Sequence, residues 1–298
     1  MTIAYSRAQA ESTETTVEQV LTLDCPERPG IVRAVSGFLY DHGCDIIDNK
    51  QFGDRRAGHF FMRVHTIMPG RDHTIEELSD GFRPVAEQFE MSWSLEPHGA
   101  KKRVLVMVSK FGHCLNDLLF RARVGDLPIE VVAVVSNHQD HEAMVRWHGI
   151  PFFHIPVTPE NKSAAEAQLL HLVDDHRVDL VVLARYMQVL SDGLCHQLAG
   201  RAINIHHSFL PSFKGANPYL QAYNRGVKLV GASAHYVTGD LDEGPIIAQE
   251  VINADHTLEP RDLVAVGRDA ETVALTKAVR WHCEGRVIIQ GLRTVVLR

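Results

Sequence analysis

From residue 103 to residue 237 the chain alternates short apolar runs with amphipathic segments, and this alternation strongly constrains the fold. Apolar runs typical of buried strands lie at 103–109, 129–136, 152–155 and 180–184. Segments with helical periodicity lie between them, at 115–123, 141–148 and 162–176. Strands that alternate with helices predict a mostly parallel sheet with right-handed crossovers. We therefore expect a Rossmann-like α/β domain over residues 103–298.

Residues 16–96 follow a different order and predict a separate domain. Strand-like runs occur at 17–23, 44–52, 59–67 and 91–95, and helix-like runs at 31–42 and 74–89. A turn is expected at 24–30. The resulting order, βαββαβ, is ferredoxin-like. We expect residues 97–102 to be a linker and residues 1–15 to be a flexible polar tail.

Composition opposes several classes of function. The net charge is −7 without a long basic run, so a nucleic-acid groove is not expected. Five scattered cysteines without a CxxC pair fit free thiols in a reducing cytosol. The N-terminus lacks an apolar signal core, and no apolar run approaches the ~20 residues that span a bilayer. These features predict a cytoplasmic protein that binds neither nucleic acid nor membrane.

Residues 202–249 contain the candidate catalytic groups. Asn204 and His206 share one face of a strand, at the end where parallel sheets place their sites. A second strand, 229–237, ends in an acidic turn that can bring Asp240 or Asp242 beside them. The amide can stabilise an oxyanion, the imidazole can carry a proton, and the carboxylate can hold the imidazole charge or activate water. The composition of the turn leaves Asp240 and Asp242 equally possible.

The histidines of this stretch also allow a metal site. His206, His207 and His235 could bind zinc together with Asp242. Asn204 is a poor zinc ligand and no HExxH helix is present, so we expect no metal. His207 alternates away from His206 and is expected to be a packed structural residue, whereas His235 is expected to line the pocket.

Several motifs occur in an order that resembles the folate-dependent formyltransferase family over residues 103–298. They are Asn204-x-His206, then Ser208-Phe-Leu-Pro211, then Leu241-Asp-Glu-Gly-Pro245. The phrase HHSFLPSFKGANPY is most similar to the deformylase branch of that family. The resemblance implies that Asp242 is the essential carboxylate. It also implies hydrolysis of 10-formyltetrahydrofolate to formate and tetrahydrofolate, which supplies formate to purine synthesis and balances one-carbon pools.

The resemblance further implies how the substrate is held. The loop at 186–190 would hold the pterin ring, partly by backbone groups. The implied folate-binding residues are Met187, Gln188, Val189, Leu190, His235, Val237, Thr238, Gly239 and Asp240. Gln188 stands where the family often carries Arg, and Leu220 where the deformylases usually carry His. Folate is a substrate here and water the nucleophile, so no cofactor is implied.

The loop at 109–114 bears on the alternative of formyl transfer. A transformylase of this family cradles a substrate phosphate in a Gly-rich loop at this position. Here the loop has one glycine and the bulky Phe111 and His113, which disfavours a ribonucleotide acceptor. Formyl transfer to another amine, and a non-catalytic folate or amino-acid sensor, are the remaining alternatives.

The first domain contains phrases, CPERPGIV, DIIDNKQF and GHFFMRV, that resemble an ACT domain. ACT domains commonly pair edge to edge and bind amino acids at the interface. The resemblance implies a homo-oligomer joined through this domain, with an amino-acid effector near Asp24, Pro29, Gly30 and Ile31. Regulation and pure assembly are equally open.

Overall fold

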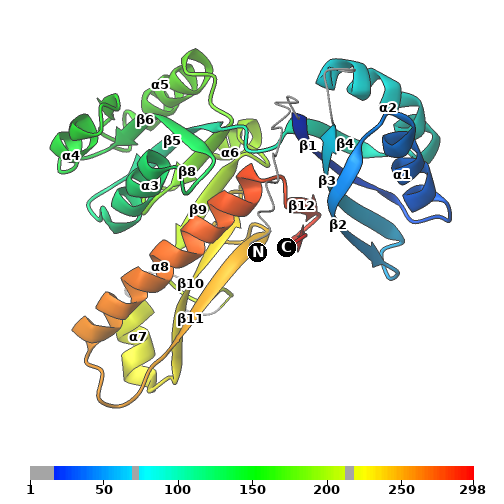
Figure 1. Cartoon of the computed structure of the whole chain (residues 1–298). Coiled ribbons are helices and arrows are strands. Elements are labelled where there is room, and N and C mark those ends of the chain that lie inside the picture. Colours follow the sequence, from blue (N-terminus) through cyan, green and yellow to red (C-terminus); the bar gives the residue numbers. More distant parts are fainter. Residues whose placement is uncertain (1–16, 69–73, 212–217) are drawn as a thin grey trace, which may run out of the picture. The chain divides into compact units, whose positions relative to one another are not determined.

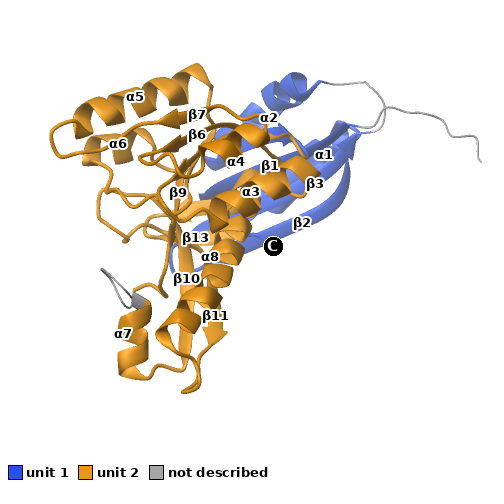
Figure 2. Cartoon of the chain, turned by 90° about the vertical axis from the view of Figure 1, so that its left-hand side faces the viewer, with its two compact units in different colours: residues 1–98, 297 blue, residues 99–296, 298 orange. Residues whose placement is uncertain are grey.

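A computed structural model describes residues 17–68, 74–211 and 218–298. The chain divides into two compact units, residues 1–98 with Leu297 and residues 99–296 with Arg298 (Figure 2). The division falls within the stretch 97–102, where a linker is expected. The expected tail, residues 1–15, lies outside the described residues.

The first unit has the predicted βαββαβ order, so the ferredoxin-like fold is confirmed. Its elements are β1 (Val17–Pro26), α1 (Ile31–Asp41), β2 (Asp45–Asp54), β3 (His59–Met68), α2 (Ile75–Phe89) and β4 (Ser92–Pro97). The strands form an antiparallel sheet in the order β2-β3-β1-β4 (Figure 1). Both helices pack their apolar stripes on one face of this sheet, and residues such as Val35, Met62 and Phe82 form the core.

The predicted turn at 24–30 is wrong in its first half, because β1 continues to Pro26. Asp24 still pairs with Phe61, and Pro26 with His59. The reason is visible in the alternation of Leu21, Leu23 and Cys25, which are all buried in the core. A proline is tolerated at a strand end, where it removes no interior ladder bond.

The second unit alternates strands and helices as predicted. Its elements are β5 (Lys102–Val108), α3 (His113–Val124), β6 (Ile129–Ser136), α4 (Glu142–Trp147), β7 (Phe152–His154), α5 (Lys162–Asp175), β8 (Leu180–Leu183), α6 (Asp192–Gln197), β9 (Ala202–His206), α7 (Pro218–Arg225), β10 (Leu229–Tyr236), β11 (Ile246–Asn253), α8 (Pro260–Cys283), β12 (Val287–Gln290) and β13 (Arg293–Val296). None of the helices described in either unit has the length and apolar character required to cross a membrane.

The large sheet of this unit has the strand order β11-β10-β9-β8-β5-β6-β7. The strands from β9 to β7 pair in parallel, whereas β10 is antiparallel to both β9 and β11. The predicted mostly parallel sheet is therefore confirmed. The carboxyl ends of β5, β8 and β9 meet at one edge, which is where open α/β sheets place their sites.

Helices cover both faces of the sheet (Figure 1). Residues of α3, α4 and α8 pack on one face against side chains such as Val106 and Ile203. Residues of α5 and α6 pack on the other face against side chains such as Leu105 and Val181. The sheet is thus buried on both sides, as its near-continuous apolar strands require.

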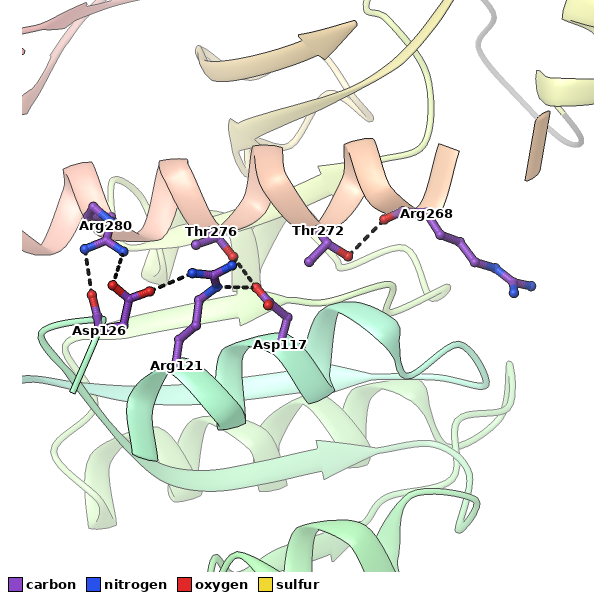
Figure 3. Close-up of polar contacts among 7 residues, drawn as sticks. All are labelled: Asp117, Arg121, Asp126, Arg268, Thr272, Thr276 and Arg280. Atoms are coloured by element: carbon purple, nitrogen blue, oxygen red, sulfur yellow. Dashed lines mark hydrogen bonds and ion pairs between the residues drawn. The ribbon is translucent and has the colours of Figure 1, made fainter. Parts of the chain in front are cut away.

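The helix α8 is fixed against α3 by polar contacts (Figure 3). Thr276 Oγ1 donates to Asp117 Oδ2 at 2.7 Å, and Arg280 Nη1 donates to the Asp126 carbonyl at 2.6 Å. Arg121 donates to the carboxylates of both Asp117 and Asp126, at 2.8 and 2.6 Å. This network sets the position of α8, whose first half reaches the cavity described below.

Candidate active site

The second unit contains a cavity of about 780 Å³ at the carboxyl ends of β8 and β9. This volume is in the range of small-molecule sites. Apolar side chains, among them Leu183, Met187, Val189 and Val237, line one part of it. The titratable lining residues are His113, Arg185, Tyr186, His206, His207, Tyr219, His235, Asp240, Asp242, Arg268 and Glu271, with Cys195 beside the apolar part.

The strand β9 brings Asn204 and His206 into this cavity. Ile203 and Ile205 alternate with them and lie in the core beneath α8. The amide and the imidazole therefore share the opposite face, and both line the cavity. His206 is 6% exposed, and its Nε2 makes no hydrogen bond with any described residue.

Asp242 lies in the loop between β10 and β11, and the loop brings its carboxylate to His206. The distance from Asp242 Oδ2 to His206 Nδ1 is 3.2 Å, and from Oδ1 to His235 Nε2 it is 3.7 Å. Burial by itself would raise the pKa of Asp242, but the neighbouring imidazoles of His206 and His235 outweigh it. The pKa is held well below its ordinary value of 3.8. Asp242 is therefore a carboxylate at any working pH.

Two backbone features place this carboxylate. Asp242 has a φ of 57°, a left-handed conformation that aspartate adopts more readily than most residues. A Cβ on Gly244 would lie 1.8 Å from the Tyr236 carbonyl oxygen, so only glycine permits the chain to turn back there. Tyr236 N then donates to the Pro245 carbonyl at 3.0 Å and closes the loop onto β10.

His235 orients the amide of Asn204. Its Nδ1 lies 2.8 Å from the Tyr236 carbonyl, an acceptor, so this nitrogen carries the proton. Nε2 lies 3.2 Å from Asn204 Nδ2, and it accepts from this amide whenever it carries no proton itself. The amide NH₂ therefore faces His235 within the cavity.

The loop at 186–190 and the residues after β10 form the walls around this group. Met187, Gln188, Val189 and Leu190 all line the cavity. The loop is held by Ser109, whose Oγ accepts from Met187 N at 3.0 Å and donates to Asn137 Oδ1. His235, Val237, Thr238, Gly239 and Asp240, the other folate-binding residues implied by the sequence, line the same cavity.

His207 lines the cavity too, and its ring packs beside those of His206 and Tyr219. Burial, and next the charges of Arg185 and His206, lower its pKa to about 4. His207 is therefore a neutral imidazole near neutral pH. Leu220, the second departure from the deformylase pattern, also lines the cavity and is 47% exposed. The stretch 212–217 of the HHSFLPSFKGANPY phrase lies outside the described residues.

The sequence did not reveal a second polar group in the cavity, which we call the Arg185 group. It consists of Arg185, Glu271, His113 and Tyr219. Glu271 is 1% exposed, its Oε2 accepts from His113 Nε2 at 2.9 Å, and its Oε1 accepts from Tyr219 at 2.8 Å. Arg185 Nε lies 3.3 Å from Glu271 Oε2. Gly267 makes room for Tyr219, since a Cβ there would lie 2.2 Å from the ring.

Two groups of described side chains have the spacing of metal ligands, and neither includes Asn204, His206 or Asp242. One is His113 with Cys114 and Glu271. Burial, followed by the charge of Glu271, raises the pKa of the Cys114 thiol well above its ordinary value, which disfavours the thiolate that a metal requires. The other is Glu18 with His65 and His98. In it, Glu18 Oε2 lies 2.9 and 3.1 Å from the two imidazoles.

The four residues expected to bind an effector lie at the start of α1. Gly30 precedes the helix with a φ of 98°, and no side chain caps the helix N-terminus. Ile31 is 2% exposed, so its side chain belongs to the core. Asp24 lies in β1 and not in a turn, and its Oδ2 is 2.8 Å from His59 Nε2. Only Pro29 and Gly30, of these four, remain in the turn itself.

Two family models match the chain. The formyl transferase model matches residues 102–279, and the ACT domain model matches residues 19–80. A formyltetrahydrofolate deformylase of Corynebacterium sp. (strain P-1) is 59% identical over 282 residues, which are 95% of this chain and 99% of that protein.

Solved structures extend this similarity to the fold. The formyltetrahydrofolate deformylase of Burkholderia mallei ATCC 23344 aligns with a TM-score of 0.90 at 48% identity, over 95% of this chain and all of that chain. Glycinamide ribonucleotide transformylase 1 of Symbiobacterium toebii aligns with a TM-score of 0.63 at 31% identity, over 69% of this chain and 98% of that chain. The likeness to the deformylases thus covers both units, and the chain belongs to the formyltetrahydrofolate deformylase family.

Proposed function

We propose that this enzyme hydrolyses 10-formyltetrahydrofolate to formate and tetrahydrofolate in the cavity of its second unit. The observation that carries the proposal is the convergence of Asn204, His206 and Asp242 on one cavity, in a chain similar to deformylases over nearly its whole length. The apolar walls at 186–190 and after β10 suit a flat ring system such as pterin.

The three residues have complementary roles in this proposal. The amide of Asn204 and Nε2 of His206 donate to the formyl oxygen as the tetrahedral intermediate forms. Asp242 holds the imidazole of His206 in its charged form and orients the attacking water. Because its pKa is lowered, Asp242 is a weak base, which favours the orienting role over full deprotonation.

The bond changes balance as a simple hydrolysis. The water oxygen bonds to the formyl carbon, and the C–N bond then breaks. The substrate nitrogen keeps the bonding pair and takes a proton from His206. The proton that the water loses passes by way of Asp242 to His206 and restores its charged form, and formic acid ionises to formate near neutral pH.

Water is the proposed nucleophile because bulky side chains stand at the end of the cavity near α3, where a substrate phosphate would need close approach to the backbone. Phe111 and His113 line that end, and His141 packs where a Cβ on Gly112 would lie, at 2.5 Å. The decisive measurement is formate release from 10-formyltetrahydrofolate without an acceptor. Release at enzymatic rates supports hydrolysis, and a strict requirement for an added amine supports the transferase alternative. If neither formate release nor formyl transfer is observed, the sensor alternative remains.

We also propose that the reaction requires neither a metal nor a cofactor. The proposed catalytic groups are side-chain nitrogen and oxygen atoms of the chain itself, and they contact one another at hydrogen-bond and ion-pair distances. Dialysis against a strong chelator should leave formate release unchanged. Loss of activity that added zinc restores would contradict this proposal.

The first unit, residues 16–96, is proposed to assemble the enzyme as a homo-oligomer and to bind an amino-acid effector. The uncapped N-terminus of α1 at Gly30 offers backbone N–H groups to a carboxylate. Calorimetric titration with the common amino acids tests for the effector. If none of them gives saturable heat, assembly remains as the role of the first unit. Residues 103–298 would then act as the catalytic unit behind the linker 97–102.

The proposed cellular setting follows from the chemistry. The five cysteines are free and buried, as in proteins of a reducing compartment, which favours the cytoplasm. There the enzyme would release formate for purine synthesis and balance the pools of one-carbon folates.

A further inference from the structure

The Arg185 group has no role in the hydrolysis proposed above, although it lines the same cavity. Its members come from four separate segments of the chain. Arg185 follows β8, His113 begins α3, Tyr219 lies in α7 and Glu271 lies in α8. A buried group built from four elements is costly to assemble, so a purely accidental origin is a poor explanation.

Arg185 is a buried cation with unpartnered donors. Its side chain is 9% exposed, and the Phe111 ring centre lies 5.6 Å from its guanidinium carbon. Nε and Nη1 nevertheless make no hydrogen bond with any residue that the structure describes. Buried donors that lack a partner cost free energy, and a ligand with acceptor oxygens would remove this cost.

Glu271 balances the charge of Arg185 but accepts no hydrogen bond from its Nε or Nη1. Burial would raise the pKa of Glu271, but the hydrogen bond from His113 and the charge of Arg185 lower it below its ordinary value. Glu271 is therefore ionised. Its oxygens already accept from His113 and Tyr219. The ion pair with Glu271 holds the guanidinium in place, while Nη1 has no hydrogen-bond partner among the described residues.

The surroundings of Arg185 suit a small anion. His207 is neutral near neutral pH and can share a hydrogen bond without adding charge. His206 Nε2 also has no hydrogen-bond partner among the described residues, and the centres of the His206 and His207 rings are 5.2 Å apart. Phe111 and His113 line this end of the cavity.

We propose that Arg185 binds a small carboxylate in this cavity, and that this carboxylate is the formate released by hydrolysis. The inference rests on the proposed function. A planar carboxylate matches the fork of a guanidinium, which can donate two parallel hydrogen bonds. Arg185 thereby draws the product away from the ionised Asp242, which would repel it.

A carboxylate could also come from the glutamate part of the folate substrate. That part of the molecule is long, flexible and polar, and it extends away from the pterin ring. Arg268 also lies near the Phe111 ring, with its guanidinium carbon 5.6 Å from the ring centre, and is exposed. The burial of Arg185 therefore favours formate, and the exposed Arg268 provides a matched control.

The test measures the binding of ¹³C-labelled formate to the resting enzyme by NMR line broadening, at constant ionic strength in sodium chloride. Arg185→Met should weaken formate binding by about tenfold to a hundredfold, the loss expected for charge-assisted hydrogen bonds. Glu271→Gln should tighten it, because the guanidinium loses its resident anion. Arg268→Met should leave the dissociation constant of formate unchanged.

The two variants are thus expected to change formate affinity in opposite directions, whereas a purely structural role of Arg185 and Glu271 would weaken binding in both. The double variant Arg185→Met/Glu271→Gln removes both charges and keeps the test possible if Arg185→Met does not fold; it should bind formate as weakly as Arg185→Met. Unchanged formate binding in either Arg185 variant would overturn the proposal. KM should also be measured for the Arg185→Met variant with the full substrate and with an analogue that lacks the glutamate part (a formylated tetrahydropteroate). A KM increase for the full substrate alone would show that Arg185 binds the folate tail and would overturn the proposal. Because the titration needs no turnover, its outcome is independent of whether formate release is observed.

Discussion

At the scale of single residues, the proposed catalytic group depends on backbone more than on side-chain packing. Asp242 reaches His206 because it adopts a left-handed φ and because Gly244 lets the chain pass the Tyr236 carbonyl. Asn204 presents an amide hydrogen because His235 is fixed by its own backbone contact. The donors are thus oriented before substrate arrives, which is the condition for effective oxyanion stabilisation.

Asp242→Asn should reduce formate release by about 10² to 10⁴, the range of a positioned acid–base group, while the fold persists. The reason is that the imidazole of His206 loses the anion that stabilises its charged form. Glu243→Gln, an exposed change one residue away, is the matched control and should retain activity. Near-wild-type turnover by the Asn variant would remove Asp242 from the mechanism.

The lowered pKa of Asp242 also predicts how stability depends on pH. Its carboxylate favours the folded state above its ordinary pKa of 3.8, and this contribution is lost as pH falls toward the lower folded value. One such group changes the slope of unfolding free energy by up to about 1.4 kcal/mol per pH unit. Urea titrations at pH 5, 4 and 3 should show a steeper loss for wild type than for Asp242→Asn. Parallel curves for the two proteins would refute this linkage.

The residues that the sequence revealed and those it did not differ in how they are arranged. Asn204 and His206 are two residues apart on one strand, and Asp242 lies in a Gly-flanked acidic turn, so local pattern suffices to find them. The Arg185 group is dispersed over more than 150 residues, from His113 to Glu271. Glu271 lies among Ala270, Ala274 and Leu275, where an acidic residue in an amphipathic helix gives no sign of burial. Only tertiary structure brings such residues together.

At the scale of elements, α8 links the core of the second unit to the cavity. It packs on β9, β10 and β11, and its first half supplies Arg268 and Glu271 to the cavity. The contacts with α3 shown in Figure 3 hold its second half. Loosening these contacts should therefore affect both stability and the geometry of Glu271.

Thr276→Val should lower the free energy of unfolding by about 1 kcal/mol, because it removes the hydrogen bond to Asp117 while keeping the side-chain shape. Thr272→Val is the matched control on the same helix. Its hydroxyl donates to the Arg268 carbonyl of α8 itself and makes only a weak hydrogen bond with the Cys114 thiol of α3, so we expect a change within about 0.5 kcal/mol. Denaturant midpoints measure both variants, and equal effects would show that the α3–α8 contact contributes nothing specific.

The order and type of most elements followed from periodicity, and the differences have local causes. The helix α6 was not expected; its signal was Ser191, whose Oγ accepts from Leu194 N at 3.3 Å and so caps six residues. The start of α8 is likewise set by single side chains, because Pro260 and a capping box between Glu259 and Asp262 begin it. Short helices and their caps depend on single side chains, which periodicity does not detect.

At the scale of the whole molecule, the two units have separate hydrophobic cores. The first unit packs β1, β3, α1 and α2 around residues such as Val35 and Phe82. The two clusters on either side of the large sheet contain residues of the second unit alone. Each unit therefore has the burial that an independent fold requires, and removal of the first should leave the second intact.

Deleting residues 1–98 should lower the number of chains per particle, because the proposed assembly surface lies in the first unit. Among the described residues its strand β2 pairs only with β3, and it exposes Ile47 and Phe52, at 52% and 48%. Exposed apolar edges favour pairing with a second copy, in a two-fold arrangement. Light scattering measures the mass, and Ile47→Lys in the full chain should weaken association in the same direction. If the shortened chain keeps the oligomeric state of the full chain, the second unit must assemble the enzyme and the first unit retains only the proposed sensor role.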